Sequence, residues 1–413
     1  MRAVIIGTGP AGITAAETLR NQDPTGSVVA LSTEPYPPYS PAAMADHFLT
    51  GRDETLYWKG PDVAELRGID ERRETVVIAV DVDNHEVVLR DDSRIPFEGL
   101  IIASGSRLNA PLEGAELPGI LDFKSLRMAD ELMGRVKRGQ ARTALIVGNG
   151  FIGVELSLLL ADLGVDVTII GRRPSIMPRV LDAFTAAVVQ RGLVERGVKL
   201  RLGVEAMAFV GSPHVNSVRL DDGQLQEADL IVAATGVKPH IEFLKDSPIV
   251  TDWGIHVDDS LQTSVPGIFA SGDVAEARDW LTGERFVHAI FPNAVTQGEL
   301  AASNLLGANL KYDGAEAMNS LKHLGIPVVA MGSISEPDDV LRWESDSSQR
   351  SIYLRGGTII GVQLAGDIRA AGVYRSLMLR RSDVSSFGRR LVEPSFGIGH
   401  VVADALAVST PGQ

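Results

Sequence analysis

Two glycine-rich turns, each set between a short apolar run and a helical pattern, constrain the fold of this chain more than any other feature. Both follow the spacing G-x-G-x-x-G, first in residues 7–12 and again in residues 148–153. Each belongs to a unit of about thirty residues that closes with a second apolar run, which is the layout of a βαβ unit. The sequence therefore predicts an α/β protein with two Rossmann-like dinucleotide-binding domains.

The first unit is predicted to contain strand 3–6, helix 11–21 and strand 27–32. Its glycines permit the tight turn, the approach of a pyrophosphate and the packing of helix on strand. The phosphates are expected at the positive end of the helix. Glu34 follows the second strand, where a carboxylate hydrogen-bonds ribose hydroxyls.

The second unit, with strand 144–147, helix 154–163 and strand 165–170, ends differently. Arg172 and Arg173 stand where an acid would favour NAD. Two guanidinium groups suit a 2′-phosphate, so the sequence predicts a preference for NADPH. Use of NADH is the alternative if both arginines are solvated loop cations.

Later strands supply further signals. Buried strands are predicted at 99–103 and 228–234, ending in Ser104-Gly105 and Thr235-Gly236, and a helix is predicted over 299–306. Segment 263–273 ends in Ser271-Gly272-Asp273. Together with both fingerprints, these features resemble the two-dinucleotide-domain flavoproteins, which include disulfide reductases, NADH oxidases, and ferredoxin and rubredoxin reductases. The resemblance implies FAD on the first fold, NAD(P)H on the second, and hydride transfer from nicotinamide to flavin.

The resemblance also implies the residues that contact each cofactor. For FAD these are Gly7, Gly9, Pro10, Ala11, Gly12, Glu34, Val77, Ser104, Gly105, Gly272, Asp273 and Phe291. For NAD(P)H they are Gly148, Gly150, Ile152, Gly153, Arg172, Arg173 and Gly236. Glu155 matches a glutamate that faces flavin and nicotinamide and is the candidate catalytic residue. The alternatives are a first-turn glutamate favoured by the helix dipole for Glu155, and a core aromatic for Phe291.

The 413 residues include no cysteine, which excludes disulfides, thiol nucleophiles and Cys-ligated zinc. The redox cysteine of the resembled oxidases and coenzyme A disulfide reductases falls at Ala42 or its neighbour. Pro41 and Asp46 replace an Arg and a Lys of the ferredoxin reductases. That Lys pairs with the glutamate matched by Glu155, so two acids would face each other and repel unless Asp46 points elsewhere. No histidine cluster has metal-ligand spacing, and no metal is predicted.

Charge and composition narrow the partners. With 39 Lys and Arg against 53 Asp and Glu, the net charge of −14 argues against nucleic acid or an anionic membrane as partner. No apolar stretch reaches the roughly 18 residues of a membrane span, and no signal peptide is evident, so a cytoplasmic location is expected. Six arginines in 363–392 form either a docking patch for an acidic carrier or a solvated or internally paired face, with the acids at 336–346 as candidate partners. Those arginines are Arg369, Arg375, Arg380, Arg381, Arg389 and Arg390.

We expect three domains. The FAD domain is discontinuous (1–115 and 243–315), the NAD(P)H domain spans 116–242, and a C-terminal α+β interface domain spans 316–413. The predicted function is reduction of FAD by NAD(P)H and transfer of electrons to a ferredoxin, a rubredoxin or a partner subunit. A cysteine-free NAD(P)H oxidase or quinone-type reductase is one alternative, and a non-catalytic flavin-binding regulatory protein is another. A homodimer is left open.

Overall fold

The computed structural model describes residues 1–321 and 325–409, and the chain divides into two compact units. Unit 1 comprises Met1–Pro111, Leu121–Arg138 and Thr235–Glu316. Unit 2 comprises Leu112–Ile120, Gly139–Ala234 and Ala317–Gln413. The three-domain boundaries expected from the sequence remain a prediction.

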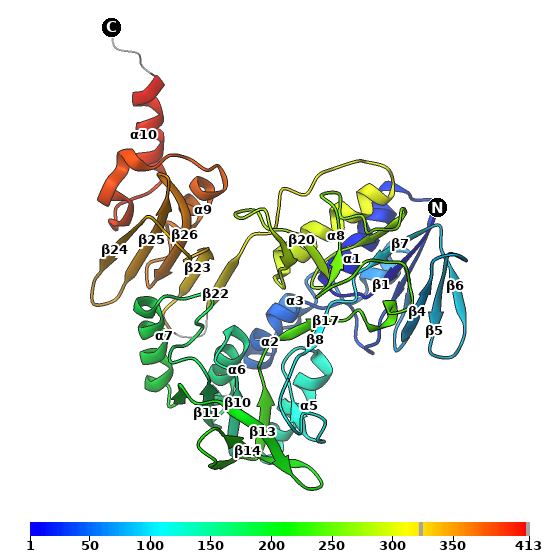
Figure 1. Cartoon of the computed structure of the whole chain (residues 1–413), viewed down its shortest axis with the longest axis horizontal. Helices are drawn as coiled ribbons and strands as arrows, with labels where there is room; N and C mark the ends of the chain where they lie inside the picture. Colours follow the sequence, from blue (N-terminus) through cyan, green and yellow to red (C-terminus); the bar gives the residue numbers. More distant parts are fainter. Residues whose placement is uncertain (322–324, 410–413) are drawn as a thin grey trace. The chain divides into compact units, whose positions relative to one another are not determined.

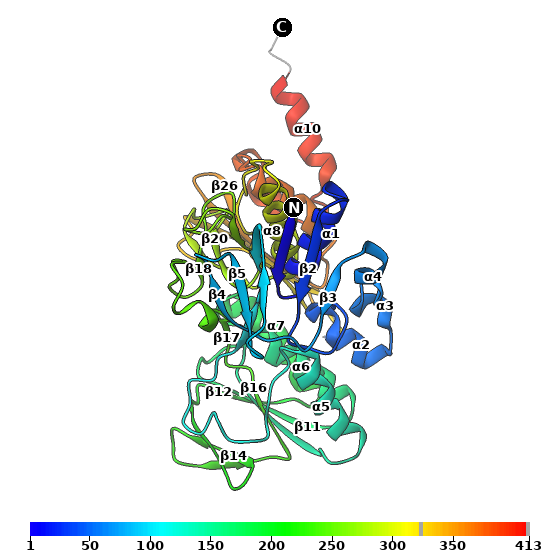
Figure 2. The ribbon, with the colours of Figure 1, turned by 90° about the vertical axis from the view of Figure 1, so that its right-hand side faces the viewer.

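A five-stranded parallel sheet forms the centre of unit 1. Its order is β19 (Ile268–Ala270), β7 (Gly99–Ile102), β1 (Arg2–Ile6), β2 (Ser27–Leu31) and β3 (Asp70–Arg72). Figure 2 shows the neighbouring strands β1 (dark blue, at N), β2 and β3. Helix α1 (Pro10–Gln22) connects β1 to β2. The central strands are continuous apolar runs because they are buried on both faces. The carboxyl ends of the strands place both Gly7 and Glu34 at one edge of the sheet.

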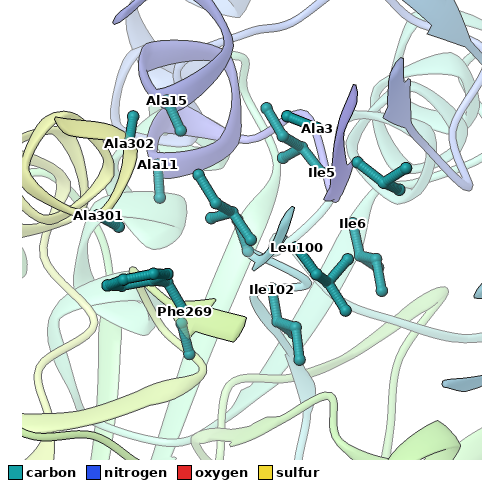
Figure 3. Packing of buried hydrophobic residues seen from close by; sticks show 14 of the residues in the cluster. Ala3, Ile5, Ile6, Ala11, Ala15, Leu100, Ile102, Phe269, Ala301 and Ala302 are labelled. Atoms are coloured by element: carbon teal, nitrogen blue, oxygen red, sulfur yellow. The ribbon is translucent and has the colours of Figure 1, made fainter. Parts of the chain in front are cut away.

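Two helices distant in sequence pack closely on each other in unit 1. Figure 3 shows Ala11 and Ala15 of α1 facing Ala301 and Ala302 of α8 (Phe291–Leu305). A Cβ on Gly298 would overlap the Ala11 carbonyl oxygen, so this crossing requires glycine. The helix predicted over 299–306 is therefore wrong at its start, because Gly298 is a packing residue inside the helix rather than a helix breaker.

The remaining elements of unit 1 are short, apart from the 12-residue helix α5. They are η1 (Pro41–Ala43), α2 (Met44–Thr50), α3 (Asp53–Leu56), α4 (Val63–Arg67), β4 (Val77–Asp81), β5 (Glu86–Leu89), β6 (Arg94–Pro96), β8 (Ser106–Leu108), α5 (Leu126–Lys137), β17 (Val237–Pro239), η2 (Glu242–Leu244), β18 (Ile255–His256), β20 (Ala275–Arg278) and β21 (Arg285–Val287). Strands β4, β5 and β6 form an antiparallel sheet, and β8 pairs with β17.

Unit 2 repeats the first architecture, mainly within residues 139–234. Its parallel sheet has the order β12 (Lys199–Leu202), β11 (Asp166–Gly171), β10 (Thr143–Val147) and β16 (Leu230–Ala233), with β9 (Ile120–Leu121) at its edge. Helix α6 (Phe151–Asp162) follows β10, and α7 (Ala183–Glu195) precedes β12. An antiparallel sheet of β13 (Ala206–Gly211), β14 (Val215–Leu220) and β15 (Leu225–Glu227) is inserted before β16.

The C-terminal part of unit 2 is an antiparallel sheet followed by helices (Figure 1). The sheet order is β22 (Met318–Leu321), β23 (Val328–Gly332), β26 (Thr358–Ala365), β25 (Gln349–Arg355) and β24 (Asp339–Glu344), followed by α9 (Ala371–Leu379), η3 (Ser385–Val392) and α10 (Ile398–Ser409). Asp182 links this sheet to α7, since its carboxylate accepts hydrogen bonds from the Arg342 guanidinium (3.0 Å) and the Tyr353 hydroxyl (2.7 Å). The predicted fold class, two Rossmann-like domains and a C-terminal α+β domain, is confirmed.

No helix in the ranges that the structure describes is both long enough and apolar enough to span a membrane.

Candidate functional site

The first glycine-rich turn is shaped by close backbone contacts. Gly7 has φ +103°, and a Cβ there would overlap the Ala103 carbonyl oxygen at the end of β7. A Cβ on Gly12 would overlap the carbonyl oxygen of Gly7. Gly9 differs, because a Cβ on it would meet nothing within 4 Å. The turn therefore leaves open space beside Gly9, at the start of α1, where Pro10 and Ala11 begin the helix and a phosphate is favoured.

Glu34 lies after β2 and has one carboxylate oxygen without a partner. Its Oε2 accepts a hydrogen bond from the Tyr39 hydroxyl at 2.7 Å. Its Oε1 is buried and accepts no hydrogen bond from the described residues. Burial raises the pKa of Glu34, and the Tyr39 hydroxyl together with the backbone amide and the charge of Arg127 offsets this only in part. A buried acceptor of this kind fits a ribose hydroxyl, so the residues present fit the adenosine part of FAD.

Tyr39 is a residue that the sequence analysis did not identify as functional. Its hydroxyl donates to Glu34 and accepts from the Leu126 amide at 3.0 Å, at the start of α5. Burial, together with the Glu34 carboxylate, raises the pKa of Tyr39 well above its usual range. Tyr39 therefore orients the carboxylate as a neutral hydrogen-bond donor. No pattern in the sequence links these residues, because Leu126 lies 87 positions away from Tyr39.

Asp273 follows the left-handed Gly272 (φ +77°) and already has two partners in unit 1. Its Oδ2 accepts hydrogen bonds from the Ser106 hydroxyl and the Lys124 ammonium, both at 2.8 Å. The amide of Gly272 donates to the Gln297 side chain at 2.8 Å. Lys124 was not predicted from the sequence, since it lies 149 positions from its carboxylate partner.

Other predicted FAD residues occupy strand ends and a helix start in the same unit. The Ser104 hydroxyl donates to the His240 carbonyl oxygen at 2.8 Å, and Gly105 has φ +69°. Val77 is the first residue of β4. Phe291 is the first residue of α8 and packs edge-on against Trp58, with ring centroids 5.2 Å apart. Whether Val77 and Phe291 contact a flavin remains a prediction.

The second glycine-rich turn has the same backbone design as the first. Gly148 has φ +129°, a Cβ on Gly153 would overlap the Gly148 carbonyl oxygen, and a Cβ on Gly150 would meet nothing within 4 Å. Ile152 is 37% exposed despite its size. These residues fit a dinucleotide pyrophosphate, as the first turn does.

Asn149, inside the second turn, fixes the loop that follows β11. Its side-chain amide donates to the carbonyl oxygens of Ser175 (2.7 Å) and Arg173 (3.3 Å), and its own carbonyl accepts from the Met177 amide (2.8 Å). A Cβ on Gly171 would lie 2.5 Å from Asn149 Cγ, so the side chain fills the space beside that glycine. The sequence places Asn149 inside the glycine-rich fingerprint. Its hydrogen bonds to residues 173 and 175 depend on how the loop after β11 folds back toward it, which the sequence does not show.

Arg172 and Arg173 both lie on the surface of unit 2, at the end of β11. Arg172 Nη1 lies 3.3 Å from Glu205 Oε1, and the two side chains are 66% and 45% exposed. Glu205 was not considered in the sequence analysis, because it follows β12 rather than β11. A carboxylate therefore lies beside Arg172, one of the two arginines on which the predicted preference for NADPH rests.

The remaining predicted residues are distributed over both units. Glu155 is half-buried on α6 in unit 2, whereas Ala42 in η1, Asp46 on α2 and Gly236 (φ +131°) belong to unit 1. The predicted approach of Asp46 to Glu155 would span the two units and remains a hypothesis, as does the catalytic role of Glu155.

The arginine run has mixed surroundings. Arg369 forms a two-contact ion pair with Asp367, at 2.9 and 3.0 Å, rather than with an acid in 336–346. Arg380, Arg389 and Arg390 are exposed. Within the described part of the chain, no group of three or more His, Asp or Glu residues is arranged to hold a metal ion.

Comparisons with known proteins agree with this geometry. A family model described as pyridine nucleotide-disulphide oxidoreductase matches residues 1–298. An NADH oxidase from Methanocaldococcus jannaschii is 29% identical over 88% of this chain and 84% of that protein. A rubredoxin-NAD(+) reductase from Pseudomonas putida is 29% identical over 84% of this chain and 94% of that protein.

The fold is also found in a solved structure of an NAD-dependent persulfide reductase from A. fulgidus. Its TM-score is 0.88 at 22% identity, covering 98% of this chain and 83% of that one. Because the family model spans both dinucleotide-binding turns, the chain belongs to the pyridine nucleotide-disulphide oxidoreductase family.

Proposed function

We propose that this protein oxidises NAD(P)H, passes the electrons to an FAD held by unit 1, and delivers them to a separate protein carrier of the rubredoxin or ferredoxin type or to a partner subunit. FAD, when bound, supplies the change from two-electron to one-electron chemistry. The observation that carries the proposal is the buried, unpartnered Oε1 of Glu34 beside an open glycine turn. It supports a resident FAD, because a buried carboxylate oxygen is costly unless a ligand satisfies it.

The residues of unit 1 would hold and orient this cofactor. Glu34 would accept a hydrogen bond from a ribose hydroxyl, and the Tyr39 hydroxyl holds its carboxylate in place. The amides at the start of α1 would bind the phosphates. Lys124 and Ser106 fix the Asp273 carboxylate through hydrogen bonds to its Oδ2. These groups bind and orient, and none of them is required to carry electrons.

Ala42 supports an acceptor outside the chain. It stands in η1, where the redox cysteine of related disulfide reductases and oxidases is expected, and an alanine forms neither a mixed disulfide nor a sulfenic acid. Electrons must therefore leave from the flavin itself. The relative named rubredoxin-NAD(+) reductase supports a protein carrier as the acceptor.

A direct oxidase or quinone-type reductase is the second candidate, favoured by the relative named NADH oxidase. An anaerobic titration separates the candidates. FAD absorbance that is lost rapidly on adding NADH or NADPH supports an enzyme, whereas flavin that stays oxidised for minutes supports the non-catalytic alternative. Cytochrome c reduction that requires added rubredoxin or ferredoxin supports the carrier reductase. Rapid consumption of oxygen or quinone without a carrier supports the second candidate.

The exposed arginines allow a test of carrier docking. If Arg380, Arg389 and Arg390 attract an acidic carrier, its reduction slows as salt rises and slows in a variant with Arg389→Gln and Arg390→Gln. Arg219→Gln is the control, because this half-exposed arginine of the same unit pairs with Glu113 and lies outside the arginine run. A rate that does not depend on salt contradicts docking through these arginines.

A further inference from the structure

The inference concerns which coenzyme the second fold accepts, and it rests on the proposed function. In a βαβ unit, an acid after the second strand accepts a hydrogen bond from the ribose 2′-hydroxyl and repels a 2′-phosphate. After β11 this chain has Gly171, Arg172 and Arg173 instead. From the sequence alone, the missing acid and the two guanidinium groups point to NADPH.

The parallel sheet brings an acid to this place from the next strand. Leu202, the last residue of β12, is in register with Gly171, the last residue of β11. Beyond the strands the backbones stay together, since the Val204 amide donates to the Gly171 carbonyl (3.2 Å) and the Gly203 amide to the Arg173 carbonyl (3.3 Å). Glu205 therefore follows immediately beside the strand-end loop.

The geometry of the loop is fixed from two sides. The residues after β12 bind one side, and the Asn149 side chain binds the carbonyl oxygens of Arg173 and Ser175 on the other. The side chains of Arg172 and Glu205 consequently meet on a preformed backbone, with Nη1 and Oε1 3.3 Å apart. An anionic group of a ligand that approaches the Arg172 guanidinium also approaches the Glu205 carboxylate.

We propose that Glu205 supplies the carboxylate missing from the end of β11, so that the chain uses NADH at least as efficiently as NADPH. The Glu205 carboxylate forms an ion pair with the Arg172 guanidinium. It would lie close to a bound 2′-phosphate and repel it, because both groups are negative. The ribose hydroxyls of NADH carry no charge and can donate hydrogen bonds to it. The preference that two arginines alone would create is offset by an acid from the loop that follows the neighbouring strand β12.

The test measures the ratio of kcat/KM for NADPH to kcat/KM for NADH in the FAD-loaded protein. In Glu205→Gln this ratio is expected to rise at least about fivefold, the scale of an exposed charge interaction of about 1 kcal/mol. The matched control is Asp166→Asn, at the opposite end of β11, where an equally exposed carboxylate pairs with Lys199 at 2.6 Å. The ratio is expected to stay within about twofold in the control. Adding Arg172→Ala to Glu205→Gln is expected to remove the gain.

Calorimetric binding of adenosine 2′,5′-bisphosphate and of AMP gives a readout independent of turnover. Glu205→Gln is expected to tighten binding of the bisphosphate relative to AMP, because the amide no longer repels the 2′-phosphate and is a weaker acceptor for the 2′-hydroxyl of AMP. The role of Glu205 is contradicted if Glu205→Gln leaves the ratio of the two affinities unchanged. It is also contradicted if the unmutated protein prefers NADPH by more than about tenfold. Neither result contradicts the proposed function. A protein that binds neither nucleotide and oxidises neither coenzyme contradicts the proposed function itself.

Discussion

The two glycine-rich turns share one backbone design but differ in the acid beside them. In both, the first glycine has a positive φ, a Cβ on the third would overlap a backbone carbonyl oxygen, and the middle glycine faces open space. Beside the first turn, Glu34 is a partly buried carboxylate with a tyrosine partner and a buried unpartnered oxygen. Beside the second, Glu205 is an exposed carboxylate paired with an exposed arginine. Under the proposed function, the turn marks a dinucleotide site in both folds, and the environment of the acid would separate a retained cofactor from one that exchanges.

The largest effect is expected where the turn itself is broken. Gly7→Ala forces a side chain into a left-handed conformation and onto the Ala103 carbonyl, so the unfolding free energy should fall by at least about 3 kcal/mol. Urea denaturation of the cofactor-free protein measures it.

Gly9→Ala is the matched comparison for the first turn. Its Cβ enters open space, so the unfolding free energy should change by less than about 1 kcal/mol, while FAD affinity falls about tenfold or more because the methyl group occupies the phosphate approach. FAD titration by fluorescence measures the affinity. A Gly9→Ala protein that retains full FAD affinity contradicts the assignment of this turn.

A smaller effect is expected for Glu34→Gln. Loss of the charged acceptor should weaken FAD about tenfold. The cofactor-free protein should not lose stability, because the raised pKa of Glu34 means that the folded state holds its proton more tightly than the unfolded state does.

The raised pKa of Glu34 also predicts how the stability of the protein depends on pH. In the unmutated, cofactor-free protein, the contribution of Glu34 to stability falls as pH rises from the ordinary carboxyl pKa of 4.5 through the raised folded value. Glu34→Gln should remove this fall, which denaturation at several pH values would detect. A variant whose stability drops at neutral pH would show that Glu34 is a structural rather than a ligand-binding acid.

The smallest effect is expected at the second turn. Asn149→Ala removes two hydrogen bonds to the loop after β11, so the KM for the coenzyme should rise roughly fivefold while FAD content stays unchanged. Asn84→Ala, which removes an exposed side-chain hydrogen bond to Asp81 in unit 1, is the control. An equal rise in KM in both variants would argue against a specific role for Asn149.

The sequence predicted the elements that depend on local pattern. Both βαβ units have strands within one or two residues of the predicted bounds, because their apolar runs and glycine turns are continuous in sequence. The start of the helix that begins at Phe291 was predicted eight residues too late, at 299. Gly298 lies inside this helix because α1 packs closely against it, and the sequence does not show that contact.

Side chains that meet across long sequence separations could not be predicted. Lys124 reaches Asp273, Tyr39 joins Glu34 to α5, and Glu205 reaches Arg172 through strand order. Each depends on which segments the fold brings together, and no periodicity within the chain encodes that.

The crossing of α1 and α8 has a consequence for how the protein is made. In the second fold, the strands and helices from β10 to β16 leave the ribosome as one continuous block. In the first fold, α1 emerges early, but its alanine-lined face is covered only after α8 has been synthesised, and the sheet is complete only after its edge strand β19. The second fold is therefore free to form first during translation, and the pocket for FAD is completed only when most of the chain has been made.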